Sequence, residues 1–434
     1  MSRNRKRLLT LGAVMLVVII VMPVLTPGAW AQSKYKTLYK FSGGKDGKSP
    51  HAGLIFDQAG NLYGTTSGGG AHGGGTVFNL TPNADGSWRE SVLYNFCSRT
   101  NCGDGALPQA GLIFDQVGNL YGTTSGSGAH GGGTVFNLTP NADGRWRESV
   151  LYNFCSLTNC GDGESPLASL IFDQAGNLYG TTWLGGAQGE GTVFRLAPNA
   201  DGSWTESVLH NFCSFELCSD GSEPFASLIF DQAGNLYGTT FSGGAHDEAG
   251  TVFKLAPNAD GSWTESVLYN FCSRTNCGDG ELPSAGLIFD QAGNLYSTTY
   301  AGGAHVEGTV FKLTPNADGS WRESVLHRFC SRTNCGDGAV PHASLIFDQA
   351  GNLYGTTAYG GDLSSCNSGP GCGVVFKLVP NSNGGWNERV LHTFADHPGA
   401  QPFAPLISDV AANLYGTTEG DGTTTFGSVF EITP

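Results

Sequence analysis

Charged residues are scarce in this 434-residue chain, since Asp, Glu, Lys and Arg together make up only 14% of it. Helix-rich proteins use Glu, Lys and Ala freely, so this composition argues against a mainly helical fold. The sequence also lacks a nucleophile elbow, a helical metal motif and a glycine loop placed between a strand and a helix, where it could bind phosphate. Glycine is abundant instead, with 66 residues, which suits short strands joined by tight turns.

Long apolar runs are absent except near the N-terminus. Four basic residues precede the apolar segment 8–25, and Ala29-Trp30-Ala31 follows it. This order predicts a signal peptide over residues 1–31, a mature chain over 32–434, and a secreted or periplasmic location. A retained membrane anchor is the alternative, although about 18 residues is close to the lower limit for a spanning helix and Pro23 interrupts the run. After cleavage we expect no membrane association.

Positive charge is also in short supply. The formal net charge is −15, and cleavage after Ala31 removes four positive charges and no negative ones, which leaves −19. A chain this acidic is a poor partner for nucleic acid or for an anionic membrane surface.

The twelve cysteines occur as six pairs that are close in sequence. In an exported protein this pattern predicts six local disulfides. A zinc site is the alternative, but it needs four converging ligands, and each pair stands alone in its part of the chain. The pairs are Cys97 and Cys102, Cys155 and Cys160, Cys213 and Cys218, Cys272 and Cys277, Cys330 and Cys335, and Cys366 and Cys372.

One segment, Gly-Asn-Leu-Tyr-Gly-Thr-Thr, recurs seven times with small changes. The tyrosines stand at intervals of 58, 58, 58, 59, 58 and 61 residues, which indicates a repeat architecture. They are Tyr63, Tyr121, Tyr179, Tyr237, Tyr296, Tyr354 and Tyr415.

Each repeat contains four short segments with strand composition. In the first copy these are residues 54–56, 62–66, 76–80 and 88–96, which we name strands a to d, separated by turns rich in Gly, Asn, Asp and Pro. Four antiparallel strands repeated seven times predict an all-β, seven-bladed β-propeller. We expect the repeats to begin near residues 52, 110, 168, 226, 285, 343 and 404.

The two ends of the chain complement each other. Residues 35–41 match a strand d, whereas the last repeat stops after strand c at residues 429–432. We therefore expect the N-terminal strand to complete the seventh blade, which closes the ring and covers an edge that would otherwise invite aggregation. We expect a monomer.

The repeat, a hydrophobic strand followed by Asp-x-x-Gly-Asn-Leu-Tyr, a Gly-rich loop and Gly-Thr-Val-Phe-Lys-Leu, resembles the GloVer tandem repeat of bacterial exported proteins. It also looks distantly like the blades of NHL and SMP-30 proteins. The resemblance covers about residues 35–434 and implies an exported propeller, but no particular activity. No residue is carried over from the lactonase-like relatives, because no position matches their metal carboxylates.

The longer loops, which join strand b to c and strand d to the next strand a, share one face of the predicted propeller. We expect any site there, because rigid blades commonly carry function on such loops. Six Asp-Gly carboxylates on this face could form a ring that binds calcium or a polyol, although a repeated Asp-Gly turn explains them better. They are Asp46, Asp104, Asp162, Asp220, Asp279 and Asp337.

Histidines recur in the b–c loops, with Gln188 in the equivalent place of the third blade. Imidazoles there could bind a metal or act in acid–base catalysis. Because separate blades hold them apart, solvated loop histidines are the favoured interpretation. The four are His72, His130, His246 and His305.

Positions that differ among the repeats are more informative about function than those that recur. The residue after Thr-Thr is aromatic in three adjacent blades, at Trp183, Phe241 and Tyr300. The residue after the loop proline adds Leu167 and Phe225 to the same sector. Such a sector suits stacking against a sugar or capture of a protein loop, while packing of the channel or of the disulfide loops is the alternative.

These observations favour an exported binding module for an extracellular glycan, protein or envelope component over an enzyme. The rival hypothesis is a hydrolase or lyase, lactonase-like and dependent on calcium at the channel mouth. Its candidates are the unrepeated His51, His342 and Glu419, which belong to blades that become neighbours when the ring closes. A purely structural spacer is the third hypothesis.

Overall fold

The computed structural model describes residues 33–366, 370–395, 399–420 and 425–434. The predicted signal peptide therefore lies outside the described residues. No helix within the described part of the chain is long and apolar enough to cross a membrane.

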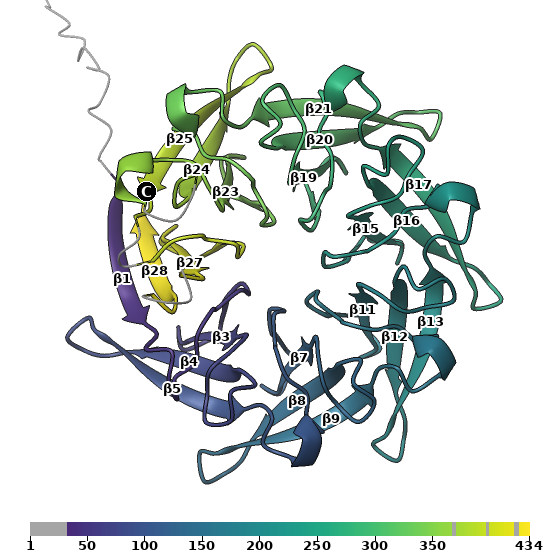
Figure 1. The fold of residues 1–434 in the computed structure, drawn as a ribbon, viewed down its shortest axis with the longest axis vertical. Coiled ribbons are helices and arrows are strands. Elements are labelled where there is room, and N and C mark those ends of the chain that lie inside the picture. Colours follow the sequence, from purple (N-terminus) through teal and green to yellow (C-terminus); the bar gives the residue numbers. More distant parts are fainter. Residues whose placement is uncertain (1–32, 367–369, 396–398, 421–424) are drawn as a thin grey trace, which may run out of the picture. The chain divides into compact units, whose positions relative to one another are not determined.

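Seven four-stranded antiparallel sheets surround one axis, which confirms the seven-bladed all-β propeller (Figure 1). In each sheet the strands follow the order a, b, c, d. Strand a is the shortest, with two residues where we expected three. The a strands are β2 (Ile55–Phe56), β6 (Ile113–Phe114), β10 (Ile171–Phe172), β14 (Ile229–Phe230), β18 (Ile288–Phe289), β22 (Ile346–Phe347) and β26 (Ile407–Ser408).

Strand b is buried along its whole length in every blade, and strand c is buried at its first three residues and its fifth. The b strands are β3 (Leu62–Thr66), β7 (Leu120–Thr124), β11 (Leu178–Thr182), β15 (Leu236–Thr240), β19 (Leu295–Thr299), β23 (Leu353–Thr357) and β27 (Leu414–Thr418). The c strands are β4 (Thr76–Pro82), β8 (Thr134–Pro140), β12 (Thr192–Pro198), β16 (Thr251–Pro257), β20 (Thr309–Pro315), β24 (Val374–Pro380) and β28 (Ser428–Thr433).

Strand d forms the outer edge of each blade. The d strands are β5 (Trp88–Asn95), β9 (Trp146–Asn153), β13 (Trp204–Asn211), β17 (Trp263–Asn270), β21 (Trp321–Arg328), β25 (Trp386–Thr393) and, in blade 7, β1 (Lys34–Lys40). Short 3-10 turns lie in the loops: η1 (Thr100–Cys102), η2 (Thr158–Cys160), η3 (Glu216–Cys218), η4 (Thr275–Cys277), η5 (Thr333–Cys335) and η6 (Leu363–Ser365).

The ring closes through the two ends of the described chain. Strand β1 pairs antiparallel with β28, with Lys34 opposite Thr433 and Lys40 opposite Ser428. Figure 1 shows the purple β1 beside the yellow β28. The predicted closure is confirmed, with the strand beginning and ending one residue earlier than the expected 35–41.

The Asp-x-x-Gly-Asn-Leu-Tyr motif builds the turn between strands a and b. In blade 1 the Asp57 carboxylate accepts hydrogen bonds from the backbone N–H groups of Ala59 and Asn61, from the Asn61 side chain and from the Tyr63 hydroxyl. Gly60 has a φ of 83°, which glycine adopts without strain. The motif is therefore part of the scaffold.

Adjacent blades share their hydrophobic cores. One cluster joins Tyr63, Val77 and Phe96 of blade 1 to Leu120 and Phe136 of blade 2, and equivalent clusters occur around the ring. Burial against a neighbour on both faces explains why these strands read as continuous apolar runs.

The first Thr of each Thr-Thr pair ties its blade to the next one. Thr65 Oγ1 donates to the Ala110 carbonyl at 3.1 Å, and six equivalent bonds follow around the axis. The last, from Thr417 to Ala52, crosses the closure and completes the circle.

Candidate functional site

The b–c loops and the connections from strand d to the next strand a lie on one face, which we call the loop face, and backbone hydrogen bonds link them to one another. The residue before each loop proline donates its N–H to a carbonyl in the b–c loop of the preceding blade, at 2.8–3.0 Å, in all seven blades. The backbone of these seven residues adopts the left-handed conformation, with φ between 54° and 61°. This conformation costs free energy for any residue with a side chain. They are Ser49, Leu107, Ser165, Glu223, Leu282, Val340 and Gln401.

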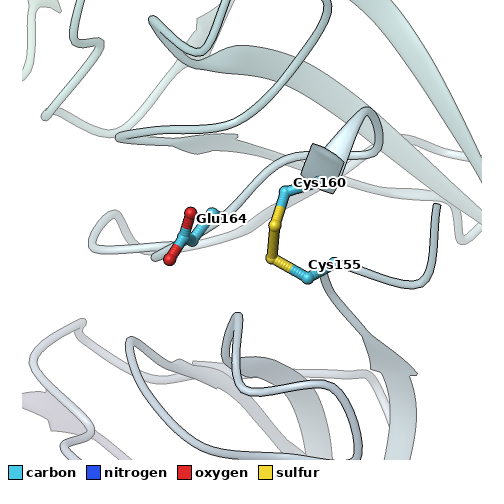
Figure 2. A group of neighbouring side chains, drawn as sticks. All are labelled: Cys155, Cys160 and Glu164. Carbon is cyan, nitrogen blue, oxygen red and sulfur yellow. A yellow bond between two sulfur atoms is a disulfide. The ribbon is translucent and has the colours of Figure 1, made fainter. Parts of the chain in front are cut away.

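All six predicted disulfides are present, and the described chain contains no free cysteine. Figure 2 shows Glu164 beside the Cys155–Cys160 disulfide; one carboxylate oxygen and the two sulfurs lie within 4.8 Å of one another. Cys272, Cys277 and Glu281 form an equivalent group. Sulfurs joined in a disulfide have no thiolate to offer, so neither group is a zinc centre.

The six Asp-Gly carboxylates are each bound within their own loop. Asp104 accepts hydrogen bonds from the Tyr94 hydroxyl, from the Ser98 N–H and hydroxyl, and from the Arg99 N–H, at 2.8–3.1 Å. Burial alone would raise the pKa of Asp104, but these hydrogen bonds outweigh it and lower the pKa.

The other five carboxylates follow the same plan. Asp220 and Asp337 face His210 and His327 in place of a tyrosine, with Nε2–Oδ2 distances of 3.3 and 3.2 Å. Asp46 accepts from Tyr39 and Ser42. Asp162 and Asp279 repeat the tyrosine arrangement. Among the described residues, no group of three close potential metal ligands includes any of the six. They serve as anchors of the disulfide loops.

The four loop histidines, His72, His130, His246 and His305, are all exposed. None of them joins a group of close potential ligands in the described part of the chain.

A cavity of about 200 Å³ lies on the axis at the loop face. Its wall contains, from every blade, the residue that follows the loop proline, and below these the Ala, Gly and Ser residues that lead into strand a. The first set differs from blade to blade: His51, Gln109, Leu167, Phe225, Ser284, His342 and Phe403.

Rings from the two sets of unrepeated positions contact one another beside this cavity, and Phe225 and His342 among them line its wall. Phe241 packs edge-on against Tyr300, with ring centroids 6.2 Å apart, and Tyr300 packs against His342 at 6.1 Å. Phe225 contacts the same imidazole at 5.3 Å. Trp183 is half-buried but makes no ring contact with the described aromatic side chains.

The three candidate catalytic residues also converge. His51 Nε2 lies 3.3 Å from Glu419 Oε2, and the His51 ring stacks on Phe403 with centroids 5.0 Å apart. Phe403 in turn contacts His342 at 5.5 Å. Desolvation, aided by repulsion from His51, lowers the pKa of His342 to about 4, so this imidazole is neutral at physiological pH.

The sequence profile of the Gloeobacter/Verrucomicrobia repeat matches residues 25–229, 202–369 and 249–434, and these matches span nearly the whole chain. The chain belongs to the Gloeobacter/Verrucomicrobia repeat family. Among solved structures, the chain is similar to one provisionally described as an oxidoreductase (glucose dehydrogenase) from Thermus thermophilus, with 17% identity, a TM-score of 0.41, and coverage of 76% of this chain and 98% of that one. The comparison with curated proteins finds no match.

Two rings beside the cavity of this Gloeobacter/Verrucomicrobia repeat protein were not singled out from the sequence as candidate site residues. Phe403 lies between both histidines, and Tyr359 contacts Phe403 with centroids 6.5 Å apart. Tyr359 follows Ala358, one place after the position compared among the repeats. A comparison that allowed a shift of one residue would have found it.

Proposed function

We propose that this protein is a binding module whose axial cavity holds the end of an extracellular or envelope glycan. Its six disulfides indicate an extracellular or periplasmic protein. The observation that carries the proposal is a set of aromatic and imidazole rings, at positions where the repeats differ, that begins in the cavity wall at Phe225 and His342 and continues outward through Tyr300 to Phe241.

The chemistry of the wall suits a sugar. A pyranose ring offers C–H groups that pack on aromatic faces and hydroxyls that need polar partners. The cavity supplies aromatic side chains together with imidazole, amide and hydroxyl groups, and the buried Ser284 Oγ has no hydrogen-bond partner among the described atoms. At about 200 Å³ it is smaller than the sites of most drug-sized ligands, which span roughly 300–1,000 Å³, and so it favours one terminal sugar unit.

The test is a double substitution in the aromatic sector. Phe241→Ala/Tyr300→Ala should reduce retention on a glycan array or on isolated envelope at least tenfold. Ser125→Ala, at the equivalent position of blade 2, is the matched control and should bind as the unmodified protein does. Unchanged retention by the double variant would refute the proposal, and Trp183→Ala measures how far the sector extends.

One observation favours a second candidate function, hydrolysis or elimination at the cavity mouth. His51 pairs with Glu419, an arrangement that can orient an imidazole as a general base, and the neutral His342 lies nearby. Calcium prefers six or more oxygen ligands, and Glu419 is the only carboxylate among the described residues of this set. Calorimetric titration with calcium distinguishes the candidates, because the binding module predicts no stoichiometric ion site there.

A further inference from the structure

A buried glutamate on strand d is covered by an arginine from the preceding disulfide loop in three blades. Arg99 lies 2.5 Å from Glu148 in blade 2, Arg274 lies 2.6 Å from Glu323 in blade 5, and Arg332 pairs with Glu388 in blade 6. The glutamate side chains are 1–4% exposed. Such a carboxylate depends on its cation, because an uncompensated charge is costly to bury.

Blades 3 and 4 keep the glutamate but lack the arginine. Leu157 and Phe215 occupy the equivalent loop positions, beside Glu206 and Glu265 respectively. One carboxylate oxygen of each of these two glutamates is buried without a hydrogen-bond partner among the described atoms, as is at least one in each of the three arginine-covered glutamates. Among the described residues, Glu206 and Glu265 of these adjacent blades lack the ion pair that Glu148, Glu323 and Glu388 make, as does Glu90 of blade 1.

The side chains that replace the arginines point outward. Leu157 is 58% exposed and Phe215 is 60% exposed. They stand on the loops that lead into two adjacent blades, 3 and 4.

Leu217 adds a second departure from the repeat. It has a φ of 57° at the loop position where four other blades have asparagine, and it is 87% exposed. Asparagine tolerates this backbone conformation better than leucine does, so the leucine strains the loop and contributes no core packing. Departures from local folding rules without a gain in stability point to function.

We propose that Leu157, Phe215 and Leu217, which we call the blade 3–4 rim, dock a segment of another protein that carries arginines among apolar side chains. Its guanidinium groups pair with Glu206 and Glu265, in the places that Arg99, Arg274 and Arg332 fill elsewhere. Its apolar side chains cover the rim, and one guanidinium stacks on Phe215. Charge complementarity selects this partner, since the chain carries a net charge of −15. The rim is separate from the axial cavity and does not depend on the glycan proposal.

The test replaces the three rim residues by the arginine and asparagine that other blades carry at the same loop positions. Leu157→Arg/Phe215→Arg/Leu217→Asn should raise the melting temperature, because both carboxylates gain partners and the loop is relieved of strain. The probe is a synthetic peptide of alternating arginine and leucine, measured by fluorescence polarisation at 0.15 M salt. The triple variant should bind this peptide at least tenfold more weakly than the unmodified protein. Replacing either the arginines or the leucines of the peptide by serine should weaken binding equally.

Two further variants separate docking from general attraction to cations. Gln116→Arg/Gln174→Arg adds the same charge at exposed a–b turns and should bind as the unmodified protein does. Leu157→Ser/Phe215→Ser/Leu217→Asn removes the apolar surface without adding charge and should weaken binding.

Three results would overturn the inference: equal binding by the triple variant, an equal loss in the Gln116/Gln174 control, or a concentration-dependent dimer in sedimentation that the triple variant abolishes. The dimer would make a second copy the occupant.

Discussion

Individual carboxylates hold the disulfide loops in shape. Asp162 is fully buried and accepts four hydrogen bonds from its loop, so the charge is stabilised by local donors. The repeated Asp-Gly is thus explained by loop structure, and the functional differences lie in the side chains that these anchored loops present.

Asp162→Ala should lower the free energy of unfolding by about 3 kcal/mol, because it leaves buried donors unsatisfied. Thermal or urea unfolding measures the change. Asp201→Ala, in an exposed turn between strands c and d, is the control and should have a much smaller effect. If Asp162 instead served an ion, its loss would abolish a calcium-dependent shift in melting temperature.

The strand that closes the ring is held partly by ring stacking. Tyr35 on β1 stacks on His392 of β25, with centroids 4.0 Å apart and nearly parallel planes, and also contacts Phe394 and Phe430. Desolvation lowers the pKa of His392 to about 4. The unfolded chain therefore takes up a proton on this histidine at a higher pH than the folded chain does.

As the pH falls from about 6.5 to 4, protonation of His392 in the unfolded chain should lower the free energy of unfolding by roughly 2–3 kcal/mol. Well below the folded pKa the loss should stop growing. Burial raises the pKa of several strand-d glutamates, such as Glu206, to about 7, and these act in the opposite direction because their destabilisation grows as the pH rises. The contribution of His392 is therefore the difference between the unmodified protein and His392→Phe in denaturant unfolding between pH 7 and 4. If the free energy of unfolding changed with pH in the same way for both proteins, the predicted contribution of His392 would be wrong.

At the scale of the whole molecule, the ring depends on one pairing between residues far apart in sequence. Without β1, strand β28 presents an open edge, and such edges recruit other chains.

A chain that begins at Gly43 should therefore form oligomers or aggregates in light scattering, whereas a chain of residues 33–434 should remain monomeric. Adding a synthetic peptide of residues 33–42 should restore the monomer. A truncated chain that is monomeric and equally stable would show that the edge is protected by other means.

The architecture could be predicted from the sequence because the repeats report it seven times. The Tyr63 motif fixes the period, and residues 35–41 match the strand missing from the last repeat. The cavity could be predicted only in part. His51, His342 and Glu419 were found as unrepeated residues in neighbouring blades, but the contacts of the two histidines with Phe403 depend on side-chain directions that spacing does not give.

The loop aspartates show the reverse case, in which the sequence suggested a ligand site and the structure explains the residues by local hydrogen bonding. Asp104 and its equivalents formed a plausible ligand ring in the sequence, since six carboxylates share a face. Only the tertiary structure shows that each one is held by donors of its own loop, as Asp104 is by Tyr94, Ser98 and Arg99. The pairing of Arg99 with Glu148, 49 residues away, was likewise missed, because nothing in either repeat alone relates the two.

The pairing of β1 with β28 has a consequence for how such genes change in length. The closing strands lie before the first repeat and at the end of the last one, so insertion or deletion of a whole 58-residue unit between them leaves both partners intact. The number of blades then depends on how tightly neighbouring blades pack and on the hydrogen bonds from threonine hydroxyls to alanine carbonyls around the axis. Duplication can enlarge the ring without a new closure, while the shared cores determine which copy numbers survive.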